Sequence, residues 1–149
     1  MENRTIHKKL QGIQSSLKAP KGQTNKFGGY SYRSAEDILT AVKPLLQQYG
    51  CTLVISDDII GVKDRVYVKA TAVLAESESD YSIQVQGFAR EAYTRKGMDD
   101  SQITGSASSY ARKYALNGLF AIDDTKDADA TNDHGKRQSK SSAKSDFDF

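Results

Sequence analysis

Residues 65–91 read RVYVKATAVLAESESDYSIQVQGFARE, and this stretch decides the fold class. Apolar and polar side chains alternate over residues 65–75 and again over 81–91, which is the period of a strand with one buried face. The polar segment ESESD between them is long enough for the turn of an antiparallel hairpin. Directly upstream, CTLVIS at 51–56 predicts a short apolar strand. The region therefore predicts a three-stranded antiparallel meander.

The two long strands of this meander should bury one face and expose the other. The expected inward set is Val66, Val68, Ala70, Ala72, Leu74, Ile83, Val85 and Ala89. The expected outward set is Arg65, Tyr67, Lys69, Thr71, Gln84, Gln86, Phe88 and Arg90. Because a large apolar ring is unusual on a solvated face, we expect a helix or another subunit to cover Phe88.

Helical periodicity precedes the meander twice. Residues 3–18 carry one apolar stripe, which consists of Ile6, Leu10, Ile13 and Leu17. The Gly- and Tyr-rich stretch at 21–34 predicts a loop or a short hairpin. Ser34 then has the character of an N-cap, and Gly50 suits the C-terminal end of the helix that follows. Pro44 lies inside that helix and should kink or divide it.

A third helix follows the meander, with the sequence QITGSASSYARKYALNGLF at 102–120. Its expected apolar face is Ile103, Ala107, Tyr110, Ala111 and Tyr114, which recur at helical spacing. Gly105 and Ala107 should let this face approach the sheet closely, with Arg112 roughly opposite and Lys113 on the flank. Asn117-Gly118 should end or distort the helix. The order of elements predicts an α+β domain with helices packed on an antiparallel sheet.

Length and composition place a boundary near residue 126. The chain has 149 residues and a formal net charge of +2, which suits one domain and a tail. Residues 127–145 contain no Val, Ile, Leu, Met, Phe or Tyr, so residues 127–149 are predicted to be a disordered polar tail. No apolar run is long enough to span a membrane, and no secretory signal is visible. One cysteine and two histidines exclude a disulfide framework and disfavour zinc.

Mixtures of aromatic rings and cations suggest a nucleic-acid interface, because rings stack on unpaired bases while cations bind phosphates. They occur in the segment 26–33, on the outward sheet face, before the last helix and on that helix. The candidate residues are Lys26, Tyr30, Tyr32, Arg33, Lys69, Arg90, Arg95, Lys96, Arg112 and Lys113. Each group also has an ordinary structural explanation, either as a tyrosine-rich turn packed on the core or as a solvated face.

Catalytic patterns are weak by comparison. The two histidines lie near the N-terminus and in the tail, and Cys51 begins a strand as a small buried residue would. Asp99-Asp100 and Asp123-Asp124 could hold Mg²⁺ in a nuclease, but they also suit a helix start and a helix exit. There is no P-loop motif. We expect a protein that is not an enzyme and requires no cofactor; Mg²⁺ could accompany bound DNA, but the sequence does not require it.

The chain ends in Asp146, Phe147, Asp148 and Phe149. Acidic and aromatic ends of this kind can insert a ring into a pocket while the carboxylates contact a basic rim, although a random end would look the same. The tip is similar to the acidic C-terminal peptide of bacterial single-stranded-DNA-binding proteins. It is therefore a candidate partner-binding segment.

Two segments together resemble the ERF (essential recombination function) family of phage single-strand annealing proteins. They are NKFGGYSYRSAEDILTAVKPLL at 25–46 and GMDDSQITGSASSYARKYALNGLFAIDD at 97–124. The resemblance covers about residues 3–126, and its motifs are a Gly-Tyr-x-Tyr segment before a capped helix and a Ser/Tyr/Ala-rich helix that ends in Asp-Asp. The resemblance implies a β-β-β-α annealing core that assembles into an oligomeric ring or filament.

The resemblance also implies a function. Such a protein binds single-stranded DNA and anneals complementary strands in phage recombination without ATP, in the cytoplasm of the bacterial host. Its partners would be further copies of itself, and a phage exonuclease or the host single-stranded-DNA-binding system. Arg112 and Lys113 would hold the DNA backbone, and the segment 26–33 would stack on bases or contact a neighbouring subunit. The alternatives are a protective single-strand binder, a Mg²⁺-dependent nuclease and an interaction module that binds no DNA.

Overall fold

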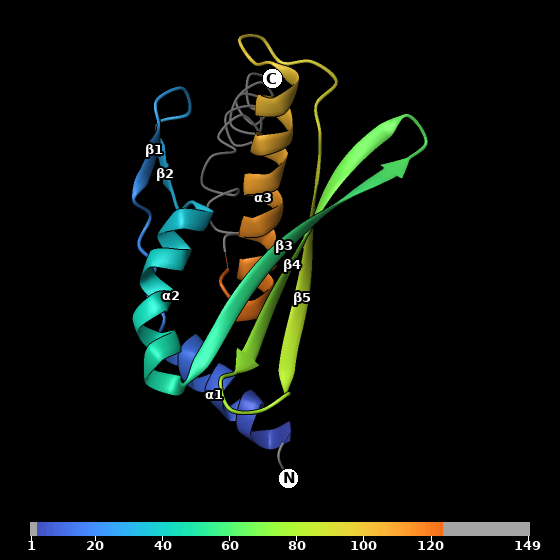
Figure 1. Ribbon diagram of the computed structural model, residues 1–149. Coiled ribbons are helices and arrows are strands. Elements are labelled where there is room, and N and C mark those ends of the chain that lie inside the picture. Colours follow the sequence, from blue (N-terminus) through green and yellow to red (C-terminus); the bar gives the residue numbers. More distant parts are fainter. Residues whose placement is uncertain (1–2, 124–149) are drawn as a thin grey trace, which may run out of the picture.

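The computed structural model describes residues 3–123 as three helices, a small hairpin and a three-stranded sheet (Figure 1). In chain order the elements are α1 (Asn3–Ser16), β1 (Gln23–Asn25), β2 (Tyr30–Tyr32), α2 (Ala35–Tyr49), β3 (Cys51–Val62), β4 (Arg65–Glu76), β5 (Ser82–Arg90) and α3 (Asp100–Phe120). The α+β class, the expected order of elements and the hairpin at 21–34 are confirmed. None of the helices described is long and apolar enough to cross a bilayer.

The sheet is an antiparallel meander in the order β3-β4-β5. Residues that lie directly opposite each other on paired strands share a face, and the buried face carries Val68, Ala70, Ala72 and Leu74 of β4. Helix α3 lies along this face, while α1 and α2 pack at one end of the sheet (Figure 1). The alternation expected over residues 65–91 is therefore largely confirmed.

A close approach between α3 and the sheet occurs at Gly87 on β5. A Cβ atom at this position would overlap backbone atoms of Ala111, Tyr114 and Ala115. The helix can lie this near because its buried face consists of alanines there. Gly105 and Ala107 were expected to allow this approach. Ala107 is buried as expected, but Gly105 is exposed, and a Cβ atom added there would meet no atom within 4 Å, so the prediction for Gly105 was wrong.

The C-terminal half of α3 joins the two N-terminal helices in one hydrophobic core. Ile6, Leu10 and Ile13 of α1 are buried as predicted, while Leu17 lies beyond the end of α1 and is half-buried. They share one core with buried residues of α2 and α3, which are Ile38, Val42, Leu116, Leu119 and Phe120. This burial explains why α3 continues through Asn117-Gly118 to Phe120, contrary to expectation. The helix ends only at Ala121, which adopts a left-handed conformation.

Both later helices begin with reciprocal caps. The Ser34 hydroxyl accepts a hydrogen bond from the backbone N–H of Asp37, whose carboxylate accepts one from the backbone N–H of Ser34. Asp99 and Gln102 form the same arrangement before α3. Gly50 ends α2 in the left-handed conformation, as expected. Helix α2 is not divided at Pro44, which lies within its continuous span.

Strand β3 is longer than the short strand that CTLVIS predicted. It pairs with β4 at every position from Cys51 to Val62, and a two-residue turn at Lys63 and Asp64 joins the strands. Because this pairing satisfies the backbone over the whole length, it overrides the low strand preference of Asp57 and Asp58. We call the outer part of this hairpin, residues 59–66, the β3–β4 arm.

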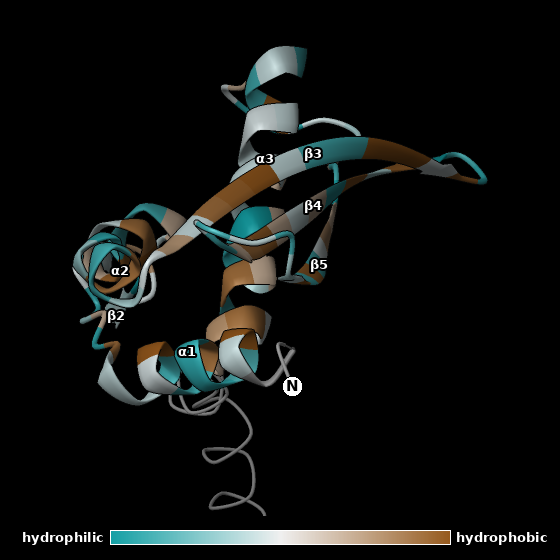
Figure 2. Cartoon of the chain, turned by 60° about the horizontal axis from the view of Figure 1, so that its bottom comes forward, coloured by the Kyte–Doolittle hydropathy of each residue, from teal (hydrophilic) through white to brown (hydrophobic). Residues whose placement is uncertain are grey.

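The β3–β4 arm projects beyond the helices that cover the rest of the sheet (Figure 2). Three of its apolar side chains, Ile59, Val62 and Val66, are consequently exposed, while Ile60 is half-buried. Val66 was expected to be buried, and that prediction was wrong because α3 does not extend over this end of the strand. Phe88, which was expected to be covered, is 49% exposed on the opposite face of the sheet.

Substitution of Gly87 tests the close approach of α3. Gly87→Ala should lower the free energy of unfolding by about 1–3 kcal/mol, because a methyl group must displace helix backbone. Urea denaturation measures the change. Gly105→Ala is the matched control on an exposed helical position, where alanine should be neutral or stabilise by up to about 1 kcal/mol. Equal stability of the two variants would contradict the packing described here.

The cap of α2 gives a prediction about pH. Hydrogen bonds from the backbone N–H of Ser34 lower the pKa of Asp37 below 3.8 in the folded protein, so its contribution is present above that pH and is lost as the pH falls through the lowered pKa. Asp37→Asn should cost about 0.5–1 kcal/mol of unfolding free energy at neutral pH and progressively less in acid. Glu36→Gln, in the same turn, should show a smaller and flatter difference. A constant difference for Asp37→Asn at all pH values would contradict this assignment.

Candidate nucleic-acid interface

The β1–β2 hairpin presents two tyrosines on one side. Its turn is organised by the Asn25 side chain, whose Oδ1 accepts hydrogen bonds from the backbone N–H groups of Phe27 (2.9 Å) and Gly28 (3.1 Å). The Nδ2 of Asn25 donates to the Tyr30 hydroxyl at 2.9 Å. Tyr30 and Tyr32 lie two residues apart on β2, so their rings share a face, with centroids 6.2 Å apart. The hairpin therefore holds its rings in a defined place.

A cleft forms where this hairpin meets α3, and we call it the hairpin cleft. It has a volume of about 200 Å³ and is lined by Tyr32, Arg33, Ser34, Ala35, Ser109, Tyr110 and Lys113. The Lys113 ammonium lies 5.7 Å from the centre of the Tyr32 ring, within the range of a cation–π contact. Two rings and two cations from distant parts of the chain thus line one cavity.

Arg33 supports this cleft from behind. Its Nε donates a hydrogen bond to the carbonyl of Ala19 at 2.8 Å, which ties the end of β2 to the segment that follows α1. The side chain is half-buried, and it lines both the hairpin cleft and a second cavity beside Phe120. Its geometry suits a positioning role at the base of the hairpin.

The other flank of α3 carries a larger cavity beside the last strand, which we call the β5-edge pocket. Its volume is about 350 Å³, and it combines apolar and aromatic walls with two guanidinium groups; the lining residues are Phe88, Ala89, Arg90, Ala92, Arg95, Met98, Ile103, Ser106, Ala107, Tyr110 and Tyr114. Tyr110 lines both this pocket and the hairpin cleft. The two cavities are therefore neighbours on α3.

Tyr110 and Tyr114 are exposed, although the sequence pattern assigned both to the apolar face. They are 50% and 48% exposed, and their ring centroids lie 6.2 Å apart. The buried line of α3 runs instead through Ala107, Ala111 and Ala115. The tyrosines flank that line on the side of β5, so they form an aromatic surface that the sequence analysis missed. The feature of the sequence that could have indicated this exposure is the phenolic hydroxyl of each tyrosine, which requires water or a hydrogen-bond partner.

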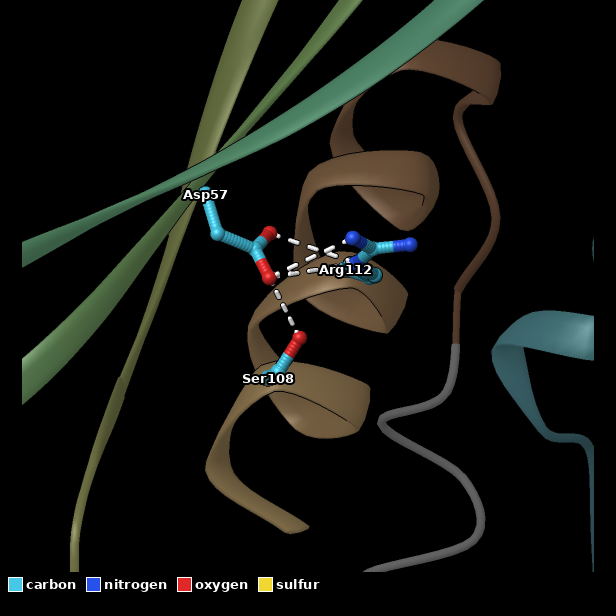
Figure 3. A network of polar contacts seen from close by, with 3 residues as sticks. All are labelled: Asp57, Ser108 and Arg112. Atoms are coloured by element: carbon cyan, nitrogen blue, oxygen red, sulfur yellow. Dashed lines mark hydrogen bonds and ion pairs between the residues drawn. The ribbon is translucent and has the colours of Figure 1, made fainter. Parts of the chain in front are cut away.

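Arg112 and Lys113 are neighbours in the chain but point to different elements. Arg112 turns toward β3, where its Nε lies 3.2 Å from Asp57 Oδ1 and its Nη2 lies 3.3 Å from Asp57 Oδ2. The Ser108 hydroxyl donates to the same carboxylate at 2.5 Å (Figure 3). Arg112 was expected opposite the apolar face, but the contact with Asp57 places it on the sheet-side flank. Sequence reasoning missed Asp57 and Ser108, because no local pattern links residues that lie this far apart in the chain.

The remaining candidate cations lie elsewhere. Lys69 is on the outer face of the sheet, opposite Phe88 and Asp58 on the neighbouring strands. Arg90 lies on the same face of the exposed β5 edge and also lines the β5-edge pocket. Lys26 and Lys96 are exposed in the β1–β2 turn and in the loop before α3. The structure thus distributes the ten candidates over several surfaces, and the hairpin cleft and β5-edge pocket gather five of them.

The residues weighed for catalysis have structural positions. Asp99 is the N-cap of α3 and Asp100 lies in its first turn, as the helix-start interpretation predicts. Cys51 is buried, and this burial raises the pKa of its thiol, as expected for a small packed residue. No cluster of metal-ligating side chains occurs among residues 3–123. Asp124, His134 and the candidate segment 146–149 lie outside the described residues.

Comparisons with known proteins agree with the family resemblance of the two sequence motifs. The model of the ERF superfamily matches residues 6–147. The chain is 52% identical over 142 residues to the Essential recombination function protein of Salmonella phage P22, an alignment that covers 95% of this chain and 67% of the phage protein. The family match continues past residue 126, further than the two sequence motifs indicated. No solved structure matches the chain.

The hairpin cleft leads to a prediction about stacking. Tyr32→Ala should weaken binding of a single-stranded oligonucleotide by at least about fivefold, because stacking of one base on an aromatic ring contributes about 1–3 kcal/mol. Fluorescence anisotropy of a labelled oligonucleotide measures the affinity. Tyr32→Phe keeps the ring and should retain the affinity. Loss of binding in both variants would show that the hydroxyl, and not the ring, matters.

Proposed function

We propose that this chain, which belongs to the ERF superfamily, binds single-stranded DNA and anneals complementary strands during phage homologous recombination. Family membership supports a recombination function, since the phage P22 relative carries that function in its name. The physical form of that function is our inference from the surfaces of α3 and the β1–β2 hairpin.

The hairpin cleft is the observation that carries the proposal. Lys113 supplies a cation for a phosphate group, and Tyr32 and Tyr110 supply ring faces for unpaired bases. Such contacts accept any base, because every base has a π-face and every nucleotide a phosphate. Recognition of this kind suits a protein that must bind strands of any sequence and leave the choice of partner strand to base pairing.

The β5-edge pocket extends the same chemistry along α3. Arg90 and Arg95 lie beside Tyr110 and Tyr114, so cations and rings continue past the hairpin cleft. A strand that followed this side of α3 would meet several phosphate-binding groups in succession. Neutralised phosphates lower the repulsion between two strands, which allows a second strand to test its pairing with the first. This step requires neither ATP nor a bound cofactor, and we propose that the protein is not an enzyme.

Several copies would act together. A net charge of +2 gives each copy modest attraction for DNA, so avidity from a homo-oligomeric ring or filament is needed. The exposed apolar residues Ile59 and Val62 of the β3–β4 arm, and Phe88 on the sheet, offer surface for contacts between copies. We expect the assembly to act in the host cytoplasm, together with a phage exonuclease or the host single-stranded-DNA-binding system.

Annealing of complementary fluorescent oligonucleotides without ATP tests the proposal. The wild-type protein should accelerate annealing at low salt and lose the effect at high salt, because phosphate contacts release counterions. The double substitution Arg112→Ala and Lys113→Ala should slow annealing about tenfold or more and reduce the salt dependence of binding by about one to two counterions.

Each contrary outcome has a distinct meaning. Tight binding without faster annealing would indicate a protective single-strand binder. Strand cleavage that requires Mg²⁺ and is lost on Asp99→Ala or Asp123→Ala would indicate a nuclease. Absence of any binding to DNA would overturn the nucleic-acid function. Glu78→Gln, a charge change in the exposed turn between β4 and β5, serves as a control for nonspecific effects.

A further inference from the structure

Three donors on α3 converge on one carboxylate of β3. The Nε and Nη2 groups of Arg112 and the hydroxyl of Ser108 all donate to Asp57, at the distances given above (Figure 3). Ser108 and Arg112 lie one helical turn apart, so their side chains project from the same side of α3. Together they form a small oxyanion site, and the carboxylate of Asp57 fills it.

The donors of this site match a phosphodiester as well as a carboxylate. A guanidinium group offers two parallel N–H donors to two oxygens of one oxyanion, and a serine hydroxyl adds a third donor that needs no charge. We propose that Ser108 and Arg112 form a binding site for a DNA phosphate group, which Asp57 occupies until the strand arrives. This proposal rests on the proposed function, because it assumes that DNA reaches this side of α3.

The exposure of the pair permits such an exchange. The side chains of Arg112 and Asp57 are 41% and 24% exposed, so water and ions reach both. Ion pairs in this setting contribute little net free energy, typically less than about 1 kcal/mol. A phosphate group can therefore replace the carboxylate at small cost. The released Asp57 would remain hydrated, because β3 is an edge strand of the sheet.

The next residue of α3 lacks this competition. Within residues 3–123, Lys113 makes no ion pair and lies instead over the Tyr32 ring. The two adjacent cations therefore bind phosphate differently. Lys113 attracts any nearby phosphate, whereas Arg112 binds a phosphate only when that phosphate displaces Asp57. Asp57 thus competes with phosphate for the donors of Arg112 and Ser108, and it weakens binding of every anion at this site, a DNA phosphate included.

Asp57→Asn tests the exchange, with Asp58→Asn as its matched control. Both substitutions remove one negative charge from β3, but Asp58 lies on the opposite face of the strand, beside Lys69. The full chain should bind a labelled single-stranded oligonucleotide about three- to fivefold more tightly after Asp57→Asn, and with little change after Asp58→Asn. The slope of log affinity against log salt should steepen by about 0.7 per phosphate group gained.

A double-mutant cycle identifies the cation involved. In an Arg112→Ala background, Asp57→Asn should no longer tighten binding, because the site that Asp57 occupies has been removed. Ser108→Ala gives an independent readout should Asp57→Asn fail to fold, as judged by circular dichroism. It changes no charge and should weaken DNA binding about twofold to threefold if the hydroxyl donates to phosphate.

These experiments distinguish the exchange of Asp57 for a phosphate from DNA binding itself. An Asp57→Asn protein that binds no more tightly than Asp58→Asn, or an equal gain in the Arg112→Ala background, would overturn the exchange while leaving DNA binding intact. Ser108→Ala with unchanged or tighter DNA binding would also overturn it, since Ser108 would then serve Asp57 alone. Failure of the wild-type chain to bind single-stranded DNA would overturn the proposed function and this site with it.

Discussion

One row of residues across the sheet determines where α3 lies. Asp57, Ala70 and Gly87 are directly opposite one another on β3, β4 and β5, and all three face the helix. Gly87 has no side chain, so the backbone of α3 rests on it, and Ala70 adds only a methyl group. At the other end of the row, the Asp57 carboxylate reaches the flank of the helix. A larger residue at Gly87 would move α3 away from the sheet. The packing of α3 on Ala70 and the hydrogen bond between Ser108 and Asp57 would then both be lost.

In this position α3 faces the sheet, the two N-terminal helices α1 and α2, and the β1–β2 hairpin. Carboxylates hold both sheet-side flanks: Asp57 accepts from Ser108 on the β3 side, and Glu91 accepts from the Thr104 hydroxyl at the end of β5. The C-terminal half turns inward to α1 and α2. What remains open is the side near the β1–β2 hairpin, where Lys113 and Tyr110 line the hairpin cleft, and the neighbouring surface of Tyr110 and Tyr114, which lines the β5-edge pocket. The candidate interface is thus the part of α3 that packing leaves open.

The sequence predicted those parts of the fold whose signals are local. Alternation over β4 and β5, and the cap at Ser34, reflect burial and hydrogen bonds that adjacent residues already encode. The full length of β3 could not be predicted from the sequence. Asp57 and Asp58 have a low strand preference, and only their pairing with β4 makes this segment part of the strand. Tyr110 was assigned to the wrong face for a related reason. Helical spacing shows which residues lie on the same side of α3, but only the packing of the alanines of α3 on Gly87 shows which of them are buried.

The same limit explains why the candidate site was only partly foreseen. A sequence shows Arg112 and Lys113 as an equivalent pair, whereas the structure gives one a carboxylate and the other an aromatic ring. This difference suits the annealing function that we propose, in which the protein must bind a strand and later release the duplex. A carboxylate that competes for the same guanidinium lowers the net free energy of phosphate binding and therefore favours release. If Asp57 competes for Arg112, rebinding of the carboxylate offsets part of the cost of losing DNA, and the strand can be exchanged under the same ionic conditions that bound it.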